Sequence, residues 1–122
     1  MCYKKHFIPL ESDPEIFTAL MHDLGVSKLL EFIDVLSLED RAILDAIPRP
    51  VLALILVLPP CPTYEEHNAK GQPVANEDVV WLRQTINNAC GLYALLHAVC
   101  NMPGYLSKAF FMTLLPSLLM YR

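Results

Sequence analysis

The sequence predicts a single α/β domain, and three observations support that prediction. A well-capped helical pattern begins near residue 14, an apolar strand-like run occupies residues 51–58, and a second helical pattern begins at Asn88. Helices that alternate with strands around a wholly buried strand are typical of α/β folds. The chain has 122 residues, of which 54% are hydrophobic and 18% charged, and this composition is typical of one globular domain with one core.

The first predicted helix has clear start and stop signals. Ser12 and Asp13 can both cap its N-terminus, Pro14 suits the first turn, and Glu15 follows Ser12 at the spacing of a capping box. Gly25 is expected to end the helix. The expected apolar stripe consists of Ile16, Leu20 and Leu24.

Three further segments are predicted to be strands. The segment "EFIDVL" at residues 31–36 alternates acidic and apolar residues, as a half-buried strand does. The segment "VLALILVL" at residues 51–58 lies between Pro50 and Pro59. It is too short to cross a bilayer and is predicted to be a strand buried on both faces. The third segment, "VVWL", occupies residues 79–82.

The remaining segments connect or follow these strands. The motif "SLED" at residues 37–40 predicts a second N-cap and a short helix that Pro48 stops. Residues 59–77 are rich in proline and polar residues and are predicted to form a surface loop. The helix expected from Asn88 places four apolar residues on neighbouring faces, namely Ala89, Leu92, Leu96 and Val99.

The last segment, residues 102–122, is an atypical apolar tail. It contains no acidic residue and is interrupted by Lys108 and Pro116, both of which weaken an interpretation as a membrane anchor. As a core helix it would lack a polar face. The predicted organisation is therefore one domain at residues 6–101 followed by this tail, and a membrane partner is not expected.

The charge distribution favours a basic partner or a solvated acidic surface. The net charge of −4 argues against a nucleic-acid partner. Residues 1–48 hold nine acidic residues against four basic ones. Both interpretations of this acidic surplus remain open.

The four cysteines predict free thiols and no metal or other cofactor. Cys2, Cys61, Cys90 and Cys100 form no CxxC pair, and no histidine stands at zinc-finger spacing. The first residues, "MCYKKH", do not resemble a signal peptide. These features predict a reducing, intracellular environment.

One cysteine has neighbours that suit a nucleophile. Within "QTINNACGLYALLH" at residues 84–97, Cys90 stands at the expected helix N-terminus, where unpaired amides and the helix dipole favour a thiolate. The same amides can stabilise an oxyanion, and the side chain of Gln84 could donate to it as well. Gly91 leaves room for a substrate to approach. The alternative interpretation is a structural, packed cysteine, because buried cysteines are common.

Several motifs in one order resemble a known family. The segment "QTINNACGLYALLHA" resembles the active-site signature of the ubiquitin carboxyl-terminal hydrolases, which are small papain-like deubiquitinases. Upstream, "FIPLESDPEIF", "EFIDV" and "IPRPVLALILVLP" resemble the N-terminal half of that family in order and spacing. The resemblance covers about residues 6–101, and it departs from the signature at Leu92, where the family usually has threonine.

The resemblance implies a fold, an activity and a set of site residues. It implies a papain-like cysteine peptidase fold and hydrolysis of the bond after the C-terminal glycine of ubiquitin, without a cofactor, in the cytoplasm or nucleus. Cys90 would be the nucleophile, and Gln84 would stabilise the oxyanion. The residues implied to contact ubiquitin are Pro9, Leu10, Glu11, Glu15 and Asp34.

The sequence lacks an obvious general base for Cys90. In the family, the catalytic histidine and acid come from a strand and a loop well beyond the nucleophile helix. In this sequence the one histidine after Cys90 is His97, and no acidic residue follows Cys90. His97 lies two helical turns from Cys90, roughly 10 Å by helical rise, and His6, His22 and His67 match no catalytic position.

Three expectations follow from the missing base. The catalytic domain is expected to be truncated after the nucleophile helix, with little or no turnover by this chain. The alternative function is a non-catalytic fragment that binds ubiquitin or its conjugates. Missing strands would also leave the apolar residues 51–58 partly uncovered, which predicts poor solubility or association.

Overall fold

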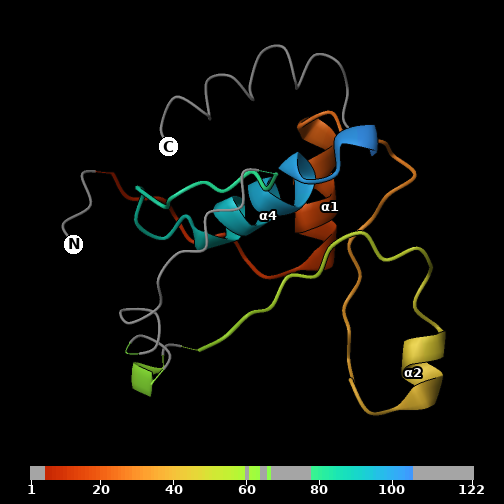
Figure 1. The fold of residues 1–122 in the computed structure, drawn as a ribbon. Coiled ribbons are helices and arrows are strands. Elements are labelled where there is room, and N and C mark those ends of the chain that lie inside the picture. Colours follow the sequence, from red (N-terminus) through yellow and green to blue (C-terminus); the bar gives the residue numbers. More distant parts are fainter. Residues whose placement is uncertain (1–4, 60, 64–65, 67–77, 106–122) are drawn as a thin grey trace.

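The computed structural model describes residues 5–59, 61–63, 66 and 78–105. The helices with described bounds are α1 (Pro14–Asp23), α2 (Arg41–Asp45) and α4 (Cys90–Cys100), and a 3₁₀ turn follows at Pro103–Tyr105. Residues 62, 63 and 66 are helical as well. Helices α1 and α4 pack against each other, whereas α2 lies at the end of an extended excursion away from them (Figure 1). The core is therefore built where the two longer helices meet.

Helix α1 begins and ends close to the predicted residues. The Asp13 carboxylate accepts hydrogen bonds from the amides of Glu15 at 2.8 Å and Ile16 at 3.2 Å, so Asp13 is the N-cap and Ser12 lies outside the helix. At the other end, Gly25 has a φ of 91° and its amide donates to the His22 carbonyl. The predicted helix is confirmed, with Asp13 as its cap.

The buried face of α1 differs from the predicted stripe. Phe17 and Met21 are buried, whereas Ile16 is exposed at its surface and Leu20 and Leu24 are half-buried. Both stripes run along the helix at a spacing of four residues, so the sequence pattern alone does not separate them. The position of α4 decides which one is covered.

The short helix α2 confirms the second predicted cap. The Asp40 carboxylate accepts from the amides of Ala42 at 2.9 Å and Ile43 at 3.4 Å, and the Ser37 hydroxyl accepts from the Asp40 amide at 3.0 Å. None of the residues of α2 is buried. Local hydrogen bonds therefore define this helix, and it adds nothing to the core.

Helix α4 supplies the centre of the core. Leu95 and Val99 are fully buried, and Cys100 is also buried. They pack with residues from α1 and the turn after it, namely Phe17, Met21 and Val26. The Phe17 ring also meets the Phe32 ring edge-to-face, with 5.5 Å between centroids.

The three strand predictions are wrong for the described part of the chain. Residues 31–36, 51–58 and 79–82 are assigned to no strand. The β-type pairing of the described residues consists of single bridges: His6 and Asn87 form an isolated parallel bridge, and Val26 is also a bridge residue. The helical half of the α/β prediction is observed there, and a sheet is not. A strand requires a hydrogen-bonded neighbour, and an apolar sequence does not provide one.

The predicted burial of residues 51–58 on both faces is also wrong. This segment crosses the molecule as extended chain, with Leu54 at 73%, Leu56 at 72% and Val57 at 66% exposure. Leu52 and Ile55 are half-buried, and Ile55 packs on the core. Leu52 and Ile55 are therefore the partly covered residues of this segment, and its other residues are exposed.

Two sequence predictions fall mostly outside the described residues. These are the loop at 59–77 and the apolar tail at 102–122, of which the structure describes only small parts. Among the helices that are described, none is long and apolar enough to span a membrane.

Candidate active site

Cys90 is the first residue of α4 and its side chain is exposed. Asn88, two residues earlier, has a φ of 60°, a left-handed conformation that asparagine tolerates better than most residues. The N-cap residue is Ala89, whose methyl group cannot accept a hydrogen bond. The backbone amides in the first turn of α4, beside the Cys90 thiol, are therefore not bonded to an N-cap side chain. This exposure excludes the interpretation of Cys90 as a packed core cysteine.

Cys100, at the other end of α4, differs from Cys90 in burial. It is buried, and burial raises the pKa of its thiol because the charged thiolate loses its solvation. Cys90 and Cys100 are free thiols, and the described residues hold no cluster suited to a metal ion.

Gly91 has a structural role that differs from the predicted one. A Cβ atom at this position would lie 3.1 Å from Leu10 Cβ and 3.5 Å from Phe17 Cζ. The absent side chain therefore lets the N-terminal segment and α1 approach the first turn of α4. Close packing, rather than substrate access, accounts for the glycine.

The N-terminal segment is also hydrogen-bonded to the turn before Cys90. The Phe7 amide donates to the Asn87 carbonyl at 2.9 Å, and the Asn87 amide donates to the Lys5 carbonyl at 3.0 Å. The side chains of Asn87 and His6 meet at 2.9 Å between Nδ2 and Nδ1. These bonds fix residues 5–7 beside the turn that leads into α4.

Gln84 is half-buried and its side chain is held by a local hydrogen bond. Its Nε2 donates to the carbonyl oxygen of Ile86 at 2.8 Å. Because an amide nitrogen carries two N–H groups, one remains for another acceptor. The bond sets the orientation of this amide within the segment that leads to Cys90.

The residues predicted to contact ubiquitin differ in exposure. Four of them are exposed, namely Pro9, Glu11, Glu15 and Asp34. Leu10 is half-buried, packs on the core, and lines an apolar cavity of about 220 Å³ together with residues that include Phe7, Leu20 and Leu92. Its side chain is therefore largely occupied within this chain.

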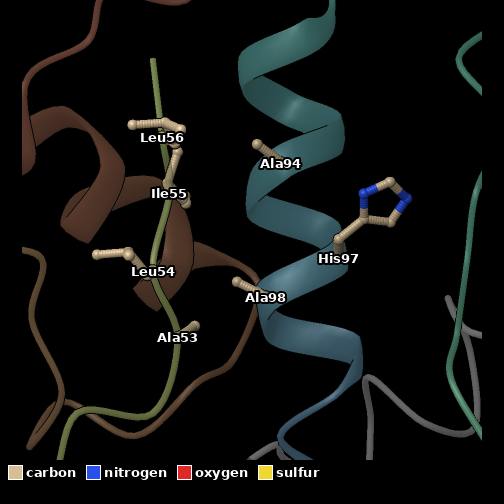
Figure 2. Close-up of a pocket in the computed structure, with 7 residues that line it drawn as sticks. All are labelled: Ala53, Leu54, Ile55, Leu56, Ala94, His97 and Ala98. Atoms are coloured by element: carbon tan, nitrogen blue, oxygen red, sulfur yellow. The ribbon is translucent and has the colours of Figure 1, made fainter. Parts of the chain in front are cut away.

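A second cavity, of about 340 Å³, lies between α4 and the extended residues 53–56. Ala94 and Ala98 of α4 face those residues, and the small methyl groups allow the segment to approach the helix (Figure 2). Figure 2 shows the His97 ring turned to the other side of α4.

Each histidine that the structure describes has a hydrogen-bond partner other than Cys90. His97 Nε2 lies 2.9 Å from the Leu82 amide and 3.0 Å from its carbonyl oxygen. His22 Nε2 lies 2.8 Å from the Leu30 carbonyl oxygen, and His6 meets Asn87. The expectation that these three are structural or solvent-exposed is consistent with these contacts, and His67 lies outside the described residues.

His97 also stacks on an aromatic ring. The centroids of the His97 and Trp81 rings are 4.4 Å apart and the rings are 13° from parallel. Burial lowers the pKa of His97, and its hydrogen bond with Leu82 opposes that shift. This contact was not predicted from the sequence. The spacing of four residues between the polar residues Tyr93, His97 and Asn101, in an otherwise apolar stretch, was a signal that could have indicated it.

Comparison with known proteins identifies the family. The sequence model of ubiquitin carboxyl-terminal hydrolase, family 1, matches residues 7–114. The chain belongs to this family. Membership implies a papain-like fold and confirms the resemblance inferred from the motifs around Cys90.

Curated members of the ubiquitin carboxyl-terminal hydrolase family match the chain over about three quarters of its length. Ubiquitin carboxyl-terminal hydrolase YUH1 of Saccharomyces cerevisiae is 38% identical over 94 residues, which cover 77% of this chain and 39% of the relative. A Drosophila melanogaster ubiquitin carboxyl-terminal hydrolase is 45% identical over 100 residues (76% and 44%). Human isozyme L1 is 37% identical over 99 residues (76% and 44%). The chain thus spans less than half the length of these relatives.

Proposed function

We propose that this chain carries the nucleophile of a cysteine-type deubiquitinase that hydrolyses the bond after the C-terminal glycine of ubiquitin. The observation that carries the proposal is the exposed thiol of Cys90 on the first residue of α4, within a match to ubiquitin carboxyl-terminal hydrolase, family 1. Curated relatives are named for the same activity. The domain responsible is residues 6–101, with 102–122 as a separate tail.

The proposed chemistry is acyl transfer through a thioester. The Cys90 thiolate attacks the carbonyl carbon of the terminal glycine, and negative charge develops on the carbonyl oxygen. The Cys90 amide and the second N–H of Gln84 stabilise that oxyanion. The C–N or C–S bond then breaks, the amine or thiol leaves with a proton, and water hydrolyses the thioester to release ubiquitin and the free thiol.

The proposed ubiquitin-binding surface combines acidic and apolar groups. Glu11, Glu15 and Asp34 are exposed and can attract a basic partner, and Pro9 is exposed beside them in sequence. Leu10 contributes by holding the segment against α4, since it packs near Gly91. We place the activity in the cytoplasm or nucleus, where ubiquitin conjugates and reduced thiols occur together.

The chain on its own is proposed to have little turnover. Proton transfer from Cys90 needs a histidine and an acid to orient it. His6, His22 and His97 all have hydrogen-bond partners elsewhere. These contacts favour the second candidate, a fragment that binds ubiquitin without completing the reaction, for the isolated chain.

A ubiquitin bearing a C-terminal electrophile tests the proposal. The purified chain should form a covalent adduct, seen as a shift in mass, that disappears in Cys90→Ala and persists in Cys61→Ala, in which the other exposed described cysteine is changed. Adduct formation by Cys90→Ala would contradict the assignment. Reversible ubiquitin binding without an adduct would favour the binding fragment.

A further inference from the structure

The extended segment at residues 80–85 is held by helix side chains instead of a neighbouring strand. In extended chain, alternate residues present both their N–H and C=O groups to the same side. Val80 and Leu82 present these groups toward α4 and the residue that follows it. Side chains of Asn101 and His97 meet them there.

Asn101 reproduces the pairing that a strand would make. Its Oδ1 accepts from the Val80 amide at 2.9 Å, and its Nδ2 donates to the Val80 carbonyl at 3.0 Å. The same Nδ2 donates to the His97 carbonyl at 2.7 Å, which fixes the amide against the end of α4. Val80 thus has both backbone groups paired by one side chain.

His97 and Tyr93 continue the pairing along the segment. His97 Nε2 lies within 3.0 Å of both the amide nitrogen and the carbonyl oxygen of Leu82. The Tyr93 hydroxyl accepts a hydrogen bond from the Thr85 amide at 3.2 Å and lies 3.1 Å from Oγ1 of Thr85. Tyr93, His97 and Asn101 follow one another at intervals of four residues, so they share one side of the helix. We call these three residues the polar ladder.

Gln84 lies between two residues that the polar ladder binds. Leu82 is anchored by His97, and its side chain is buried, whereas Thr85 is anchored by Tyr93. The Gln84 amide is then oriented by its own bond to Ile86. Because Cys90 begins the helix that carries Tyr93 and His97, the ladder ties the backbone around Gln84 to the helix of the nucleophile.

We propose that the polar ladder, with His97 at its centre, positions the segment that carries Gln84 relative to Cys90. His97 acts here as a positioning residue and takes no proton from Cys90. The consequence for oxyanion stabilisation rests on the proposed function, whereas the consequence for the backbone of residues 80–85 does not.

The protonation state of His97 decides which of its bonds it can make. An unprotonated Nε2 accepts from the Leu82 amide, whereas a protonated Nε2 can only donate to the Leu82 carbonyl and leaves the amide without an acceptor. Within the described part of the chain, the ring stacks on the Trp81 indole and bonds to the Leu82 backbone. Asp78 and Arg83 are the charged residues of the adjoining segment, and both are exposed.

Hydrogen exchange tests the positioning role directly. His97→Leu removes the ring nitrogens and should increase exchange of the amides around Leu82 and Thr85. His97→Gln, whose amide can both donate and accept, should restore protection. His22→Gln is the matched control, because His22 bonds to Leu30 and not to this segment. Equal exchange in the parent chain and His97→Leu would overturn the proposal.

Reaction with ubiquitin that carries a C-terminal aldehyde tests the consequence for the site, because attack of the thiolate on this carbonyl forms an oxyanion. His97→Leu should react at least about tenfold more slowly, because one oxyanion donor loses its position, and iodoacetamide should alkylate Cys90 at an unchanged rate. His97→Gln should recover the reaction. If His97→Leu reacted at the parent rate, the positioning role at the site would be refuted.

A milder variant, together with amide exchange as a second measurement, distinguishes a failure of the polar ladder from a failure of the proposed function. Tyr93→Phe removes only the hydroxyl that binds Thr85, so it retains the fold and should loosen this end of the segment and slow labelling. If the parent chain formed no adduct while His97→Leu still lost amide protection, the ladder would stand and the proposed function would fail.

Discussion

A Cβ atom on Gly91 would lie 3.1 Å from Cβ of Leu10, so the N-terminal segment touches the first turn of α4 where a side chain would be crowded. Gly91→Val adds a Cβ and two methyl groups to this contact and should lower the free energy of unfolding by about 1–3 kcal/mol. Urea unfolding followed by Trp81 fluorescence measures the change. Gly104→Val is a control, because no atom of the described residues, apart from its chain neighbours, lies within 4 Å of a Cβ there. An equal effect of both substitutions would contradict the contact.

Mutation can distinguish Asp13 from Ser12 as the N-cap of α1. Asp13→Ala removes the carboxylate that accepts from Glu15 and Ile16, and it should destabilise the chain by about 1 kcal/mol. Ser12→Ala is the control and should leave the denaturation midpoint unchanged, because Ser12 lies outside the helix. A larger loss from Ser12→Ala than from Asp13→Ala would show that the capping box predicted from sequence is correct.

Acidification should destabilise the fold through His97. Burial holds the pKa of His97 below its usual value of 6.5, so the unfolded chain binds the proton more readily. The contribution of His97 is therefore complete above pH 6.5 and declines as the pH falls through the lowered pKa. Denaturation midpoints across this range should fall less steeply in His97→Gln than in the parent chain. Parallel pH dependences would refute the effect.

The stack of His97 on Trp81 provides an optical check of the same titration. Trp81 is the only tryptophan, and a protonated imidazole quenches indole emission more strongly than a neutral one. Emission of the folded chain should decrease on acidification, and His97→Gln should abolish this change. A change that persisted in His97→Gln would indicate another quencher.

The exposed apolar residues within 51–58 should cause association. Leu54 and Leu56 are 73% and 72% exposed, and no backbone hydrogen bond within the described part of the chain engages this segment. Leu54→Lys with Leu56→Lys should reduce the sedimenting mass, because charges replace exposed apolar groups. Ile55→Lys should instead unfold the chain, since Ile55 packs on the core. A monodisperse parent chain with cooperative unfolding would contradict the prediction.

The site was only partly predictable from sequence. The position of Cys90 at a helix N-terminus followed from the apolar spacing after Asn88, and its exposure agrees with a reactive thiol. The role of Gly91 did not follow, because the nearest atoms belong to Leu10 and Phe17, far away in sequence. The contacts of His97 with Leu82 and Trp81 were missed for the same reason.

The sequence by itself determined the local features of this protein. The caps at Asp13 and Asp40, the turn at Gly25 and the helix beginning at Cys90 depend on interactions within a few residues, so their patterns are visible in the chain. Only the tertiary structure decided which face of α1 is buried, whether residues 51–58 have a partner, and what His97 contacts. These features depend on contacts between groups that are distant in sequence. A local pattern shows that a segment can make such contacts, but it does not show which partner the segment meets.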